Sequence, residues 1–296
     1  MRKLIIFTIL SISLWGCNTN EKNQEIPVVS VSIIPQQYFV DRLSGNHVKV
    51  NVMIPPGAGH STYEPLPSQM RDLNKSKIYF KIGHIDFEYA WMERFKNSNK
   101  QMKVVDLSEG LDLSAVEATP CNHHHHEGEH HHHSSIDPHI WLNPEMVKPM
   151  VSKIASELCL LLPKDRDSIN IRKKQFIAEI DSLDKYITQQ MDNLKSRKFL
   201  IFHPALTWYA YRYGLEQITI EVNGKEPSPS EMGKIIQTIK DNNIKVLLIQ
   251  SEFPFERAVP ISKETGVEII QINPLAYDWL NNMYKITSTI KQALSK

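Results

Sequence analysis

The chain has 296 residues, 41% of them hydrophobic, and its 34 basic and 33 acidic side chains give a formal net charge of +1. This balance comes without a basic stripe or an aromatic-interleaved Lys/Arg patch, so we expect no nucleic acid partner. The three cysteines are too few for a disulfide framework, and a chain of this length is expected to fold around two ordinary hydrophobic cores.

Residues 1–17 are typical of an export signal. Two basic residues precede an apolar run over residues 4–14, which at about eleven residues is too short to span a bilayer, where about 20 are needed. The sequence LWGC, ending at Cys17, resembles the lipobox of bacterial lipoproteins, although Trp15 stands where a small residue is usual. We therefore expect an exported protein, in the periplasm or on the outer face of the cell membrane. A lipid on Cys17 would anchor it there, with residues 18–25 as a polar tether.

From residue 26 the sequence alternates short apolar runs with amphipathic ones. The apolar runs predict strands over residues 27–34, 47–54, 77–82 and 102–106, and the amphipathic runs predict helices over 36–43, 67–74, 87–95 and 144–162. Such an alternation predicts a mostly parallel sheet covered by helices. We assign residues 26–162 to an N-terminal α/β lobe, with a histidine-rich loop at about 110–138.

One long helix is predicted over residues 165–197, within a connecting segment at 163–197. Six apolar residues in it are spaced by 4, 3, 4, 4 and 3, which places them on one stripe: Phe176, Ile180, Leu183, Ile187, Met191 and Leu194. No glycine or proline interrupts the segment. At 1.5 Å per residue the helix would extend about 45 Å, long enough to run along two lobes as a stiff connector.

The alternation then restarts and predicts a second lobe over residues 198–296. Strands are expected at 198–202, 216–221, 245–250 and 267–272, and helices at 206–213, 230–242, 255–265 and 279–294. The predicted fold class is therefore α/β, with two lobes, each a mostly parallel sheet flanked by helices, joined by one long rigid helix. Open α/β sheets bind ligands at the carboxyl ends of their strands, so we expect the site in the cleft between the lobes.

Eight of the thirteen histidines lie within residues 123–133. Imidazole is the commonest protein ligand for borderline-soft divalent metals, so the run indicates metal binding. An expression tag is excluded because it would lie at a terminus. A polar low-complexity loop without a role is the alternative. Eight equivalent imidazoles with no rigid element to fix them would make weak, exchangeable sites, so we expect an accessory role in gathering or sensing metal. These residues are His123, His124, His125, His126, His130, His131, His132 and His133.

Three single histidines stand where strands end or a rigid turn begins. His60 follows the second predicted strand, His139 lies in an Asp-Pro-His turn, and His203 directly follows the strand over 198–202. Separations of 79 and 64 residues mean that only the fold could bring them together. A lone histidine is more often a hydrogen-bonded loop residue, but three at equivalent positions favour a shared metal site. His47 and His84 are left unassigned for comparison.

The segments that carry these histidines are PPGAGHSTYEP, DPHIWLNP and FHPALTWYAYRYG. They resemble the motifs of the metal-binding lipoproteins and periplasmic proteins that serve bacterial ABC importers of zinc and manganese, and the resemblance runs from Val28 to the C-terminus. It implies that His60, His139 and His203 bind one metal ion between two lobes. It also implies that the protein, expected to be a monomer, delivers the ion to a membrane permease.

The resemblance also bears on which metal binds. Relatives that select manganese tend to carry a carboxylate at the position of His203, and three imidazoles suit Zn²⁺ better than the harder Mn²⁺. The family's fourth ligand is commonly an aspartate where this chain has Asn273. Because a neutral amide is a poor zinc ligand, we expect Glu252 to replace it, with Asn273 as the alternative, Glu64 and Asp278 as weaker candidates, and bound water possible.

Two other functions are weighed against extracytoplasmic zinc capture. A zinc ion on three histidines with an open fourth position could activate water in a hydrolase, but the sequence has no HExxH motif, so we expect no enzyme. A manganese-binding or adhesin-type relative of the same family is the other alternative.

Overall fold

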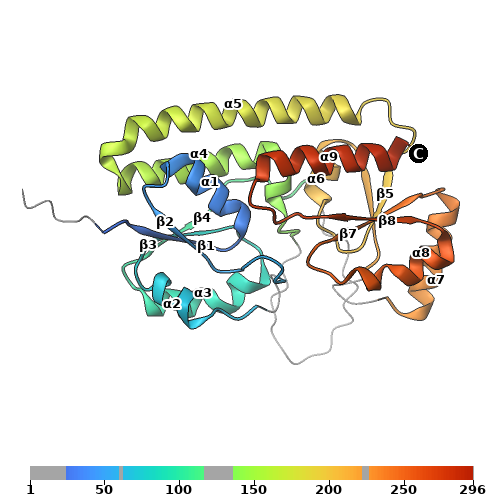
Figure 1. Ribbon diagram of the computed structural model, residues 1–296, viewed down its shortest axis with the longest axis horizontal. Helices are drawn as coiled ribbons and strands as arrows, with labels where there is room; N and C mark the ends of the chain where they lie inside the picture. Colours follow the sequence, from blue (N-terminus) through green and yellow to red (C-terminus); the bar gives the residue numbers. More distant parts are fainter. Residues whose placement is uncertain (1–24, 60–62, 117–135, 222–226, 296) are drawn as a thin grey trace, which may run out of the picture.

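The computed structural model describes residues 25–59, 63–116, 136–221 and 227–295, which form two α/β lobes side by side (Figure 1). Both lobes were predicted as alternating strands and helices, and the structure confirms this fold class. In the first lobe the elements are β1 (Val28–Val31), α1 (Ile34–Ser44), β2 (Lys49–Val52), α2 (Pro67–Leu73), β3 (Ser76–Lys81), α3 (Asp86–Ser98), β4 (Lys103–Asp106), the 3₁₀ turn η1 (Ile140–Leu142) and α4 (Pro144–Leu161).

After the 3₁₀ turn η2 (Pro163–Asp165), the long helix α5 (Arg166–Met191) leads to the second lobe. That lobe contains β5 (Lys198–Ile201), α6 (Thr207–Arg212), β6 (Glu216–Thr219), α7 (Pro229–Asp241), β7 (Val246–Gln250), the 3₁₀ turn η3 (Phe255–Arg257), α8 (Val259–Thr265), β8 (Glu268–Ile272) and α9 (Trp279–Ser295). Among the residues that the structure describes, no helix is long and apolar enough to cross a membrane.

The two sheets have the same topology. Their strand orders are β2-β1-β3-β4 and β6-β5-β7-β8, and every pairing is parallel. In each sheet the connections run outward in opposite directions from the two central strands, so the loops after those strands diverge and leave a crevice at their carboxyl ends. This switch point lies between β1 and β3 in the first lobe and between β5 and β7 in the second.

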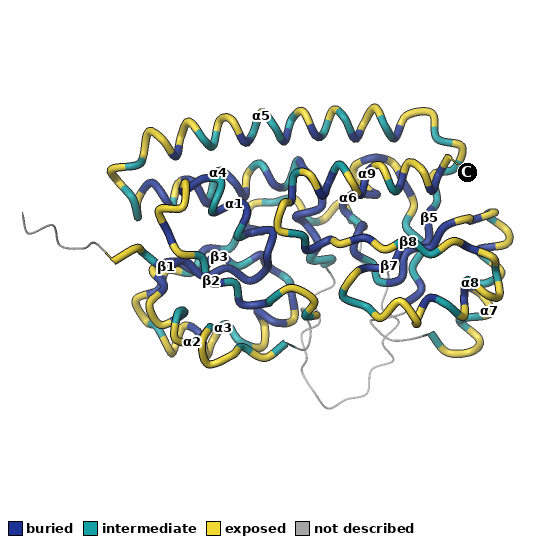
Figure 2. The backbone as a smooth tube through the Cα atoms, in the orientation of Figure 1, coloured by how far each residue is buried: buried dark blue, intermediate teal, exposed yellow. Residues whose placement is uncertain are grey.

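Helix α5 spans both lobes, with α4 and α9 between it and the sheets (Figure 1). Its buried side faces the lobes (Figure 2) and carries the predicted apolar stripe from Phe176 to Met191. Ion pairs fasten it to each lobe: Arg42 of α1 binds Glu179 at 2.7 Å, and Arg212 of α6 binds Asp184 at 2.7 Å. The connector is thus attached to both lobes near its middle.

Two predicted helix limits were wrong. The long helix ends at Met191 and not at residue 197, because Asn193 takes a left-handed backbone conformation (φ +57°), and Leu194 therefore lies beyond it. The helix expected over residues 255–265 is divided into η3 and α8. Pro260, near the start of α8, explains the division, because a proline in a helix interior removes a hydrogen bond and clashes with the preceding turn.

The hydrophobic core does not stop at the boundary between the lobes. One cluster joins buried residues of the first lobe, such as Phe39 of α1 and Phe80 of β3, to Trp208 and Trp279 of the second lobe. A smaller cluster, including Leu200 and Ile249, fills the far side of the second sheet. The lobes are therefore parts of one packed body.

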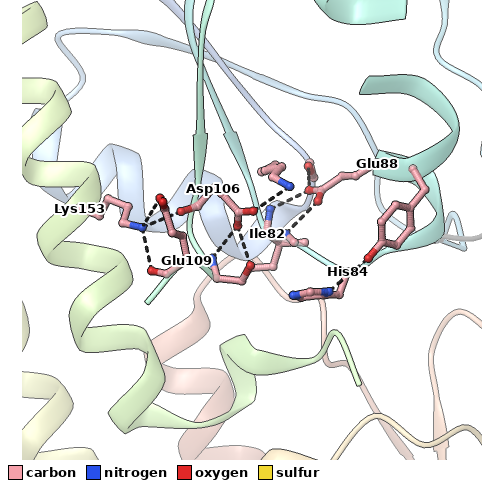
Figure 3. Close-up of polar contacts among 11 residues, drawn as sticks. Ile82, His84, Glu88, Asp106, Glu109 and Lys153 are labelled. Atoms are coloured by element: carbon pink, nitrogen blue, oxygen red, sulfur yellow. Dashed lines mark hydrogen bonds and ion pairs between the residues drawn. The ribbon is translucent and has the colours of Figure 1, made fainter. Parts of the chain in front are cut away.

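The switch point of the first lobe is closed by a buried carboxylate, that of Glu88 on α3. It accepts hydrogen bonds from the main-chain N–H groups of Ile82 (2.7 Å) and Gly83 (2.8 Å), after β3 (Figure 3), and from the hydroxyl of Ser32, after β1. Burial raises the pKa of Glu88 to about 7, although these hydrogen bonds and nearby Lys81 favour its ionised form.

The end of β4 is held from the other helical layer. Lys153 of α4 donates to the main-chain carbonyls of Asp106 (2.8 Å) and Glu109 (2.9 Å), and the Asp106 carboxylate pairs with Lys81 at 2.7 Å (Figure 3). The carboxyl edge of the first sheet is thus fixed to helices on both of its faces.

Replacing Glu88 by glutamine should flatten the pH dependence of stability. Because the pKa of Glu88 in the folded protein lies above its ordinary value of 4.5, the unfolded chain loses this proton first as pH rises. Between about pH 4.5 and 7 the free energy of unfolding should therefore fall, by on the order of 3 kcal/mol. Glu88→Gln should lack this fall, and its NH₂ group would face a main-chain N–H, at a cost of about 1–3 kcal/mol.

Urea unfolding of the metal-free protein across this pH range measures both effects. Glu93→Gln removes an exposed carboxylate from the same helix and should keep the wild-type slope. A wild-type slope in Glu88→Gln would contradict the assignment.

Candidate metal centre

The switch point of the second lobe brings two predicted ligands together. His203 follows β5 and Glu252 follows β7, the two central strands whose connections diverge. Both side chains line a cavity of about 400 Å³. His139, from the segment before α4, lines the same cavity, as does Gly59. The cavity thus receives residues from both lobes.

Several predicted residues lie outside the described ranges. These are His60, the lipidation site Cys17, and the accessory histidines at residues 123–133. Within the described residues, no three His, Cys, Asp or Glu side chains come close enough to hold a metal ion by themselves. His139, His203 and Glu252 therefore share a cavity without closing on one point.

His139 is held by Asp137 in a tight turn. The Asp137 carboxylate accepts hydrogen bonds from the main-chain N–H of His139 at 2.8 Å and from its Nδ1 at 2.7 Å. An ionised carboxylate can only accept, so Nδ1 carries the proton and the lone pair lies on Nε2. Both side chains are at least nine-tenths buried, with exposures of 5% and 10%. This is the tautomer that a metal bound at Nε2 requires.

The carboxylate of Asp137 remains ionised although it is buried. Burial alone would raise its pKa, but the electrostatic interaction with His139 and the hydrogen bonds from His139 and Thr207 outweigh that effect. Together they hold the pKa of Asp137 below its usual range. The acceptor that fixes the His139 tautomer is therefore present at neutral pH.

His203 has a carboxylate partner of the same kind. Its Nδ1 lies 2.7 Å from Glu221, whose side chain is 5% exposed. The Gln250 amide holds the main chain of His203 as well, accepting from its N–H at 3.3 Å and donating to its carbonyl at 2.5 Å. The ring centroids of His203 and His139 are 5.4 Å apart. Two oriented imidazoles therefore stand side by side.

Sequence reasoning missed both carboxylate partners. Asp137 could have been found, because an aspartate two residues before a histidine can form this local turn. Glu221 gives no such signal, since it lies 18 residues from His203 and only the parallel pairing of β5 with β6 brings them together.

Glu252 lines the cavity and interacts electrostatically with both imidazoles. Burial raises its pKa, while the electrostatic interaction with His139 and His203 opposes the shift. A cation in the cavity would also favour the ionised form of Glu252, as the two imidazoles do. Glu252 is thus placed to supply negative charge to a site of neutral rings.

The alternative ligands lie elsewhere. The Asn273 side-chain oxygen accepts from the main-chain N–H of Leu275 at 2.9 Å, and Asn273 is not among the residues that line the cavity. The Asp278 carboxylate caps α9 by accepting a hydrogen bond from the main-chain N–H of Asn281 at 3.3 Å, and Glu64 is exposed. The comparison histidines, His47 and His84, also lie outside the cavity lining.

Comparisons with known proteins identify the family that this chain resembles. Residues 29–293 match the family model described as "Zinc-uptake complex component A periplasmic". A crystal structure of ZnuA is 35% identical, with a TM-score of 0.82 over 92% of this chain and 100% of that chain. The high-affinity zinc uptake protein ZnuA of Bacillus subtilis is 26% identical over 263 residues, which are 87% of this chain and 81% of that protein.

A laminin-binding protein of Streptococcus agalactiae is also similar. It is 25% identical, with a TM-score of 0.77 over 90% of this chain and 99% of that chain, and is described as bifunctional, with adhesin and metal-transporting activity.

Replacing Glu221 by glutamine tests the role of the His203 partner. The amide keeps the shape but loses the charge that polarises Nδ1–H, and such outer partners typically contribute 10–100-fold in metal affinity. We expect zinc affinity to fall by about 10-fold or more, measured by competition with a chromogenic chelator. Glu216→Gln, an exposed carboxylate in the adjacent strand β6, is the matched control. Equal affinities in the two variants would refute the role.

Proposed function

The chain belongs to the zinc-uptake complex component A family of periplasmic proteins, and from that premise we propose how it handles its cargo. It is a binding protein and not an enzyme. It captures Zn²⁺ outside the cytoplasm, in the cavity between its lobes, and passes the ion to the membrane permease of an ABC importer. The single observation that carries this proposal is the pair of carboxylate-oriented imidazoles, His139 and His203, in one cavity.

The ligand set proposed for the ion is His60, His139, His203 and Glu252. Three neutral imidazoles and one carboxylate suit the tetrahedral N/O coordination of Zn²⁺. Gly59, which precedes His60, lines the cavity, and this supports a contribution from His60. Mn²⁺ is a poorer cargo for such a set because it prefers oxygen ligands.

Glu252 is preferred to Asn273 as the fourth ligand for two reasons. Glu252 interacts electrostatically with both imidazoles, whereas the Asn273 oxygen is already engaged by the N–H of Leu275. A filled fourth position would also leave no open site for water activation, which argues against the hydrolase alternative. Adhesion is described for the Streptococcus agalactiae relative together with metal transport, so it would accompany metal handling and not replace it.

The chain is proposed to act as a lipid-anchored monomer. LWGC at residues 14–17 supports the anchor on Cys17, and the similarity to zinc-binding lipoprotein AdcA of Streptococcus pneumoniae is consistent with it. The histidines at residues 123–133 are proposed to gather zinc near the cleft, because they lie a few residues upstream of His139.

Alanine substitutions separate the two candidate fourth ligands. Glu252→Ala should lower zinc affinity by about 100-fold or more, since even outer partners contribute 10–100-fold. Asn273→Ala should change affinity little. Elemental analysis and chelator competition give the values, and the metal-free melting temperature controls for folding. An unchanged affinity in Glu252→Ala would exclude it as a ligand.

Deleting residues 122–135 separates the histidine run from the cavity. The deletion should lower the number of zinc ions bound per chain and leave one tight site, measured by calorimetric titration. Loss of the tight site would show that the run belongs to it. A matched variant that replaces the same residues with a Gly/Ser linker of equal length controls for the shortened loop.

A further inference from the structure

His139 follows the strands of the first lobe in sequence, but the turn that contains it is hydrogen-bonded to residues of the second lobe. Trp208 of α6 is fully buried, and its indole N–H donates to the main-chain carbonyl of Asp137 at 2.8 Å. The adjacent Thr207 is hydrogen-bonded to the Asp137 carboxylate. Helix α6 therefore forms hydrogen bonds to both the main-chain carbonyl and the carboxylate of Asp137.

The donor arrangement at Thr207 is fixed by β6. Gln217 donates its amide N–H to Thr207 Oγ1 at 2.9 Å and accepts the main-chain N–H of Leu206 at 2.8 Å. With Oγ1 already accepting from Gln217, the Thr207 hydroxyl has its own hydrogen to give to Asp137. The start of α6 is thus aimed at Asp137.

Two further indoles close around the same turn. Trp141 donates to the carbonyl of Pro274 at 2.9 Å, and Trp279 donates to the carbonyl of Trp141 at 2.7 Å. All three tryptophans are fully buried, where an indole N–H without a hydrogen-bond partner would be destabilising. Segment 137–141 is therefore tied to the second lobe by three indole hydrogen bonds.

The connection from β5 to α6, which leads into Thr207 and Trp208, also carries the other imidazole. His203 lies four residues before Thr207 on the connection from β5 to α6. A displacement of this segment would move His203 directly and His139 through Asp137. The two rings are mechanically coupled although they belong to different lobes.

We propose that Thr207 and Trp208 are positioning residues for metal binding, which orient His139 from the opposite lobe through Asp137. This inference rests on the proposed function of the cavity as a zinc site. Zinc affinity then depends on the docking of α6 against segment 137–141. A permease that displaces α6 slightly loosens two ligands at once, without separating the lobes.

Trp208→Phe keeps the aromatic packing and removes the N–H, and Thr207→Val removes the hydroxyl. Each should lower zinc affinity by about 10-fold or more and speed zinc release to a chelator. Each should also alter the visible absorption spectrum of the Co²⁺-loaded protein, because the orientation of His139 changes. Trp91→Phe is the matched control, since Trp91 stacks on Phe95 in α3, and it should leave affinity and spectrum at wild-type values.

A purely structural role would lower the melting temperature of the metal-free variants and leave the Co²⁺ spectrum and zinc affinity unchanged. That result would overturn the inference, and Thr207→Val decides the matter if Trp208→Phe does not fold. His139→Ala distinguishes failure of the proposed metal site from failure of the positioning role alone. If this variant binds zinc as tightly as the wild type, the proposed site itself fails. If it loses binding while Thr207→Val and Trp208→Phe match Trp91→Phe, only the positioning role fails.

Discussion

A neutral imidazole offers one lone pair, and the group that accepts a hydrogen bond from the N–H of the other nitrogen decides where that lone pair lies. Asp137 and Glu221 make this choice for His139 and His203, each at 2.7 Å from Nδ1. Buried carboxylates need partners of their own, which Thr207 supplies for Asp137. The residues around the cavity therefore position the two carboxylates as well as the two imidazoles.

The shared core between the lobes limits how the cavity can open. Separation would expose buried surface around Trp208 and Trp279, at about 25 cal/mol for each Å² of apolar area. Helix α5, tied by ion pairs to α1 and α6, adds a second restraint. Small movements of single segments cost far less than hinge opening, and they are the motions that this architecture leaves available for loading and release.

The sequence contains much of the fold because the strands are short apolar runs and the helices are amphipathic. Every predicted strand and helix is present, and the errors fall at Asn193 and Pro260, where one residue's backbone preference ends or divides a helix. Strand ends predicted the positions of His203 and Glu252. Contacts between segments distant in sequence were not predictable in this way, and so Glu221 and the three indole hydrogen bonds appeared only in the structure.

The two sheets have the same strand order, but their switch points differ in how well they tolerate substitutions. At the switch point of the second lobe, the loops present His203 and Glu252 to the cavity, so substitutions there would alter the proposed ligand set directly. At the equivalent point of the first lobe, Glu88 binds the loops into the interior, and substitutions there weaken the fold. Evolution toward a different cargo ion thus has one adaptable switch point and one constrained switch point, built on the same topology.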